Sequence, residues 1–216
     1  MRNRFDLQLK QLNDDIIEMG NMIERAIEMG VYALIGHDTD KAKQTIDYDM
    51  DIDHMERDIE ALCMKLLLQQ QPVAGDLRQI SAALKMITDM ERIGDQADDI
   101  AEILLCRAGR PLSAGDTLRD MARATIRMVS ESVDAYVRQD VDLAQQVIAA
   151  DDEVDGYFDR IKAHLIDRIA KDVDDGEATL DLLMIAKYYE RIGDHATNIA
   201  EWVMFSVTGV HKTEAT

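Results

Sequence analysis

The sequence predicts an all-α protein made of two tandem antiparallel three-helix bundles related by an internal repeat. Three observations predict this fold. The 216 residues are mostly good helix formers, with only two prolines and 5% aromatic residues. Apolar residues recur at helical spacing along most of the chain. The pentapeptide ERIGD occurs twice, at 91–95 and 190–194, inside the near-copies ERIGDQADDIAE and ERIGDHATNIAE.

The first half contains three long predicted helices. The first covers about 5–34, and the following GHDTD supplies a turn with capping residues. The second covers about 39–70 and ends before Pro72, which cannot continue a helix. The third covers about 74–107. The segment AGRPLSAGD, with two glycines and the second proline, then indicates a linker.

The second half repeats this plan after the linker. Its DDEVD follows the DMDID of the first half by 102 residues, whereas the ERIGD copies lie 99 residues apart, so one turn is shorter. We expect the two bundles to stack through a shared apolar surface. The predicted helices lie at about 116–138, 140–171 and 175–208, and the predicted divisions are 1–108, 109–115 (linker) and 116–216.

The composition restricts the location and the partners. A formal charge of -19 argues against a protein that wraps nucleic acid or lies on an anionic membrane, and it favours cations and basic partner surfaces. Two distant cysteines give no disulfide framework and no zinc-thiolate pattern, which fits a cytoplasmic setting. No signal peptide and no spanning apolar stretch is recognisable, so any membrane role would come through a partner.

Acidic residues form a row on the third predicted helix. About a third of the circumference carries Glu91, Asp95, Asp98, Asp99 and Glu102. The opposite side is apolar and is the face that a bundle buries, so we expect the row to point away from its own core. On the second predicted helix, Asp49 and Asp53 border the apolar stripe, so two acidic rows should meet at the seam between these helices.

The second half has a corresponding but thinner row. Asp151 and Asp155 lie on its second helix, and Glu190 and Asp194 lie on its third. Thr197 and Asn198 replace the acidic pair 98–99 of the first half.

Two interpretations of these rows compete. A solvated helix face often carries carboxylates by composition alone. For each half taken separately, this interpretation is as good as a metal-binding one. Like charges four residues apart destabilise a helix, so a solvated face should intersperse lysine and arginine, which these rows do not do on their own side. The repetition therefore favours bound multivalent cations, and carboxylate oxygens favour hard ions such as Mg²⁺, Mn²⁺, Ca²⁺ or iron.

Catalytic signatures are absent from the sequence. It has no G-x-S-x-G, no glycine-rich phosphate loop and no Glu-x-x-His, and the last absence argues against a ferritin-like di-iron enzyme. His195 is rotated about a quarter turn away from the acidic row, so we expect it to support a site or an interface instead of binding metal directly. A carboxylate-cluster metalloenzyme and a purely structural helical adaptor stay open as alternatives.

The glycine of each ERIGD has a predicted packing role. Gly94 and Gly193 lie by rotation between the apolar face and the acidic row. A glycine inside a helix costs about 1 kcal/mol relative to alanine, so a compensating gain is expected. Close approach of the second helix of each half would supply that gain and bring its carboxylates to the row.

These motifs resemble the PhoU family. The resemblance rests on the doubled ERIGD-x-A-x-x-IAE, on DMDID and DDEVD, and on QQPVAGDLRQI at 70–80, and it covers about 7–209. It implies a cytoplasmic, non-enzymatic protein of two similar bundles, commonly a homodimer. It further implies a negative regulator of phosphate uptake and of the phosphate-starvation response, which couples a phosphate ABC transporter ATPase to a sensor histidine kinase.

The resemblance also implies metal clusters on E/D-x-x-x-D motifs, with iron, manganese, magnesium or zinc as the metal. Carried onto this chain, the ligands are Asp49, Asp53, Glu91, Asp95, Asp99, Asp151, Asp155, Glu190, Asp194 and Asn198. Asn198 is a departure from the pattern, because an amide oxygen ligates without adding charge, so the second site is expected to be weaker. The GDLR of 75–78 has no counterpart in the second half.

Overall fold

Six long helices joined by short turns make up the described part of the chain, which covers residues 2–69, 72–107, 110, 112, 115–171 and 176–210 of a computed structural model. No strand occurs within these residues. The helices begin and end within about three residues of the predicted positions, which confirms the all-α prediction. They are α1 (Arg2–Gly36), α2 (Thr39–Gln69), α3 (Ala74–Cys106), α4 (Gly115–Arg138), α5 (Val141–Ala170) and α6 (Gly176–Thr208).

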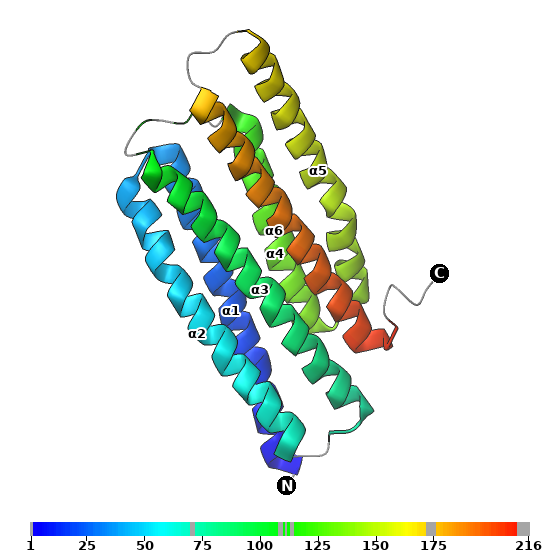
Figure 1. Cartoon of the computed structure of the whole chain (residues 1–216). Coiled ribbons are helices and arrows are strands. Elements are labelled where there is room, and N and C mark those ends of the chain that lie inside the picture. The colour runs from blue at the N-terminus through cyan, green and yellow to red at the C-terminus, as the bar shows by residue number, and fades with distance from the viewer. Residues whose placement is uncertain are drawn as a thin grey trace.

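The helices form two antiparallel three-helix bundles lying side by side (Figure 1). The first contains α1, α2 and α3, and the second contains α4, α5 and α6. The two bundles meet where α3 packs against α6 and α1 packs against α4, so α2 and α5 are the outermost helices. None of the helices, as far as they are described, is both long and apolar enough to cross a bilayer.

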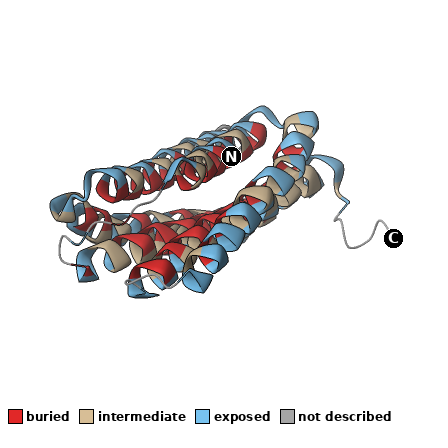
Figure 2. Cartoon of the chain, turned by 90° about the horizontal axis from the view of Figure 1, so that it is seen from above, coloured by how far each residue is buried: buried red, intermediate tan, exposed pale blue. Residues whose placement is uncertain are grey.

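One apolar core runs through both bundles. Buried residues line the inner sides of the helices and exposed residues line the outer sides (Figure 2). The same continuous cluster contains Ile23 of α1, Ile93 of α3, Met128 of α4 and Tyr189 of α6, all fully or almost fully buried. The expected shared surface between the halves is therefore a common core, and burial of apolar area along it stabilises their association.

The first turn of each half repeats at the level of single residues. His37 and Gln139, which are 102 residues apart, both have a φ of 52°. Each precedes an aspartate that caps the next helix: Asp38 accepts from the backbone of Lys41 at 3.0 Å, and Asp140 accepts from that of Leu143 at 3.0 Å. The internal repeat thus extends from the sequence into the turn geometry.

The segment between the halves is tied to α6. Arg107 is only 3% exposed, and its Nη1 lies 2.7 Å from Asp181 Oδ2. Arg110 Nη1 lies 3.0 Å from Glu177 Oε2. The predicted linker 109–115 differs in one respect, because Gly115 already begins α4. Most of that linker, the glutamines at 70–71 and the turn at 172–175 lie outside the described residues.

The two first helices differ in length. At the repeat offset of 102 residues, the first residue of α4, Gly115, corresponds to Asn13 in α1. Residues 2–12 of α1 therefore have no counterpart in α4. In Figure 1 the last turns of α5 accordingly extend past the beginning of α4.

Candidate functional site

The glycine of each ERIGD lies where the outer helix passes closest. A β-carbon added to Gly94 would lie 3.0 Å from Asp49 Oδ1 and 3.2 Å from Ile52 Cδ1, both on α2. At Gly193 the corresponding contacts on α5 are 3.2 Å to Asp151 Oδ1 and 3.4 Å to a Val154 methyl group. The predicted close approach is confirmed in both halves, and it presses one aspartate of the outer helix against each glycine.

These two aspartates are poorly solvated and carry no compensating partner. Oδ1 of Asp49 and Oδ1 of Asp151 are buried and accept no hydrogen bond. Burial raises the pKa of Asp49 to about 7, and nearby carboxylates add to the effect, namely Asp98, Asp95, Asp53 and Glu91. Burial raises the pKa of Asp151 to about 6, again with help from acidic neighbours, namely Asp155, Asp194, Glu190 and Asp152.

Four predicted ligands therefore gather at the first seam: Asp49, Asp53, Glu91 and Asp95. Burial, and after it the charge of Asp95, raises the pKa of Glu91. Asp98 is a fifth member that the predicted ligand set omits. Its Oδ1 is also buried without a partner, and burial together with Glu102 and other acids raises its pKa to about 6. Asp98 follows Gly94 by four residues and therefore lies on the same side of α3. That spacing could have predicted its place at the seam from the sequence.

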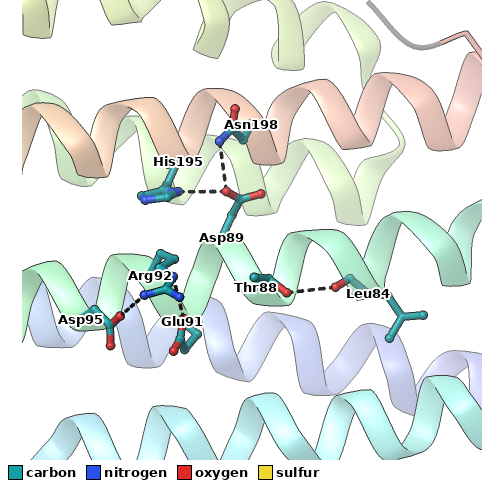
Figure 3. A network of polar contacts seen from close by, with 8 residues as sticks. All are labelled: Leu84, Thr88, Asp89, Glu91, Arg92, Asp95, His195 and Asn198. Carbon is teal, nitrogen blue, oxygen red and sulfur yellow. Dashed lines mark hydrogen bonds and ion pairs between the residues drawn. The ribbon is translucent and has the colours of Figure 1, made fainter.

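Basic side chains from other sides of the helices nevertheless reach these rows. Arg92 reaches Asp95 at 2.9 Å and Glu91 at 3.5 Å (Figure 3), although it is rotated away from them on the helix. Arg57 reaches Asp53 at 2.7 Å. The long, flexible arginine side chains allow these contacts. Because the ion pairs are exposed to solvent, they contribute little to stability.

The second seam gathers Asp151, Asp155, Glu190 and Asp194. Burial, and after it the charge of Glu190, raises the pKa of Asp155. Lys187 forms an ion pair with Glu190 and also lies over the ring of Phe158. The repeat places Thr88 at the position of Lys187 and Asp159 at the position of Arg57, so the two seams pair their carboxylates with different cations.

Two predicted ligands face the other bundle instead of the outer helix. Asn198 donates from Nδ2 to Asp89 Oδ1 at 3.1 Å, across the contact between α6 and α3 (Figure 3). At the equivalent place Asp99 faces Tyr188 and Arg191 of α6, and burial is the main cause of its raised pKa. The two residues thus lie at the bundle interface, on the far edge of each acidic row.

His195 takes part in the same interface. Its Nδ1 lies 2.9 Å from Asp89 Oδ1, and Figure 3 shows both side chains between the two helices. Of the two predicted roles, support of a site or of an interface, this contact corresponds to the interface. The unrepeated GDLR segment, 75–78, lies at the beginning of α3 and also near the second bundle. Its Arg78 side chain would lie 3.5 Å from a β-carbon added to Gly209, just after α6.

The carboxylates do not converge on one point. Throughout the described segments, no three His, Cys, Asp or Glu side chains are arranged to hold a metal ion. They lie along each seam instead, some of them held by Arg92, Arg57 or Lys187. The arrangement provides a dense row of oxygen donors, including the buried, unpaired oxygens of Asp49, Asp98 and Asp151.

Fold and site together define a duplicated helical-bundle protein with a carboxylate-lined seam in each half. The sequence profile of the PhoU domain matches it twice, at residues 16–104 and 118–203. The chain belongs to the PhoU family.

Relatives and a solved structure agree with this assignment. The chain is 35% identical over 208 residues to "Phosphate-specific transport system accessory protein PhoU homolog" of Pseudomonas aeruginosa, covering 95% of this chain and 86% of that protein. It is 32% identical over 209 residues to the PhoU accessory protein of Escherichia coli, with the same coverage. The crystal structure of PhoU from Pseudomonas aeruginosa matches with a TM-score of 0.91 and 33% identity, over 95% of this chain and 100% of that one.

Proposed function

We propose that this protein is an accessory protein of a phosphate-specific transport system and a cytoplasmic negative regulator of phosphate uptake and of the phosphate-starvation response. In this role it is an adaptor, commonly homodimeric, between the ATPase of the phosphate ABC transporter and a sensor histidine kinase. Family membership supports the transport association, since relatives in several bacteria carry that name. A helical surface without a catalytic constellation among its described residues suits an adaptor.

The proposal includes a multivalent cation at each seam. The observation that carries it is the buried, unpaired Oδ1 of Asp49 and of Asp151. A buried carboxylate oxygen without a partner is costly, and a cation would satisfy it. The ligands at the seams would be Asp49, Asp53, Glu91 and Asp95 in the first half and Asp151, Asp155, Glu190 and Asp194 in the second. Asp99 and Asn198 face the other bundle and would have to turn toward the seams to join them.

The donor set fits a hard cation, because every donor is an oxygen. Iron, manganese, magnesium and zinc are the candidates. Binding would draw Glu91 and Asp95 away from Arg92 and would neutralise the mutual repulsion of the row. Its chemistry here would be electrostatic and structural, since the cation would join the outer helix of each bundle to the helix that carries the glycine.

Removing one carboxylate from each seam should remove the metal. We expect the protein purified without chelator to contain bound metal by elemental analysis, Asp95→Ala and Asp194→Ala each to contain less, and the double variant to contain almost none. The control is Asp51→Ala/Asp58→Ala, which removes two exposed charges from the far side of α2. Negligible metal in every protein would refute the cation. If the thermal stability of the metal-free protein does not change when Mn²⁺ is added, a purely structural adaptor is favoured.

The regulatory role is tested in the cell. Deletion of the gene should derepress phosphate-starvation genes in medium rich in phosphate, and the unaltered gene should restore repression. We expect the Asp95→Ala/Asp194→Ala gene to restore it poorly and the Asp51→Ala/Asp58→Ala gene to restore it fully, with protein amounts matched by immunoblot. Unchanged transcription after deletion would contradict the regulatory proposal while leaving metal binding to its own test.

A further inference from the structure

A cavity of about 470 Å³ lies in the second bundle, away from both acidic seams. The first turn of α4, the last third of α5 and Leu182 of α6 line it. Its apolar part includes Leu118, Ile161 and Leu165, which are buried. Its polar part is basic, because Arg160, His164 and Arg168 follow one another at four-residue spacing along α5.

Arg160 and Arg168 belong to the minority of the described arginines that form no ion pair. The chain has 43 acidic and 24 basic residues, so most arginines find a carboxylate. Eight do so elsewhere, namely Arg57, Arg92, Arg107, Arg110, Arg119, Arg123, Arg127 and Arg138. By contrast, Arg160, His164 and Arg168 form no ion pair with any residue in the described part of the chain. Arg160 instead lies over the ring of Tyr157, at 4.5 Å.

Two carboxylates that are adjacent in sequence to cavity-lining residues pair with other cations. Asp116 at the start of α4 pairs with Arg119, at 3.1 Å, and is 91% exposed. Asp167 of α5 pairs with Lys171. The cavity therefore presents two guanidinium groups and an imidazole without a described counter-charge, in a protein whose formal net charge is -19.

The cavity exists because the two halves are unequal. In the first bundle, residues 2–12 of α1 continue along α2, and Phe5 and Leu12 join the core together with Leu66. The α4 helix lacks those residues, which leaves this part of α5 uncovered. At the repeat offset of 102 residues, His164 and Arg168 occupy the positions of Leu62 and Leu66. The second half thus replaces a partly buried leucine and a buried one by two hydrogen-bond donors where the first helix is shorter.

We propose that this cavity binds a phosphate ester that carries a small apolar group. The phosphate is held by Arg168 and His164, since guanidinium groups bind phosphate through paired, charge-assisted hydrogen bonds. The first turn of α4, at Gly115 and Thr117, has backbone N–H groups without intrahelical partners and adds further donors. The apolar group lies against the leucines. Inorganic phosphate alone would leave most of this volume unfilled.

Phenyl phosphate is the probe, and titration calorimetry at fixed, moderate ionic strength is the measurement. We expect Arg168→Gln to weaken its binding by about tenfold or more, because one charge-assisted hydrogen-bonding group is lost. The matched control is Arg138→Gln on α4, which removes the same charge from an exposed arginine that pairs with Asp134. This control should bind as the unaltered protein does. His164→Leu, which installs the residue of the first bundle, should also weaken binding.

Inorganic phosphate and phenol separate the two parts of the ligand, and both should bind more weakly than phenyl phosphate. Circular dichroism melting of each variant verifies the fold, since Arg168 lies in the last turn of α5 and can stabilise that helix end. Three results would overturn the proposal: no binding of phenyl phosphate, equal weakening by Arg168→Gln and Arg138→Gln, or equal affinity for phenyl phosphate and either fragment. The cavity would then be only the uncovered end of α5.

Discussion

The Gly94→Leu variant is expected to lose about 2 kcal/mol of unfolding free energy and to lose most of the metal of the first seam, although no ligand is removed. A leucine gains up to about 1 kcal/mol of helix propensity over glycine. Its β-carbon, however, would approach Asp49 Oδ1 to 3.0 Å and two Ile52 carbons to 3.2 Å. Overpacking of this kind costs about 1–3 kcal/mol or more, so the steric cost exceeds the gain.

The measurements are chemical denaturation with chelator present, and metal content without it. Two glycines serve as controls. Gly193→Leu should cost less, because the α5 atoms there lie at 3.2–3.7 Å. Gly156→Leu should cost nothing or stabilise slightly, because an added β-carbon meets only the flexible end of Arg160, at 3.6 Å. Stability and metal content at Gly94→Leu that match those of Gly156→Leu would show that α2 does not depend on the glycine.

Much of the fold follows from local signals that agree with one another. Hydrophobic periodicity placed all six helices, Pro72 placed the end of α2, and the capping residues of GHDTD placed its beginning. The glycine argument placed the seams, because a helix-interior glycine repeated beside an acidic row has few explanations other than close helix packing. The positions of residues around a single helix were sufficient for these predictions.

The position of a residue around its own helix does not show which other helix packs against the far edge of the acidic row. The circumference that carries Glu91 and Asp95 also carries Asp99, but α6 and not α2 covers that edge, so Asp99 meets Tyr188. For the same reason Asn198 turns to Asp89. Nor does a helical projection show how far Arg92 can reach. These contacts depend on the packing of the two bundles, which no local pattern encodes.

The Asp49→Asn variant is expected to be more stable than the unaltered protein at pH 8 when metal is absent, and to bind metal poorly. The folded state raises the pKa of this carboxyl from 3.8 to about 7, mainly by burial. Folded protein then holds more protons than unfolded protein between these values, so stability falls as pH rises from about 4 to 7. The full shift would correspond to about 4 kcal/mol, and we expect about 1–2 kcal/mol because the half-buried group is partly screened by solvent.

Urea denaturation in chelator across pH 5–8 measures this effect. The unaltered protein should lose stability along that range, with Asp98 and Asp151 contributing in the same direction, since both have pKa values raised to about 6. Asp49→Asn should make the loss of stability with rising pH smaller, and the control Asp51→Asn should not. Added Mn²⁺ should reverse the order at pH 8, because a cation that binds only the folded state stabilises the protein that retains its ligand. A carboxylate that lowers the stability of the metal-free protein and raises that of the metal-bound protein is retained because it binds the metal. If Mn²⁺ stabilised Asp49→Asn as much as the unaltered protein, Asp49 would have no part in the site.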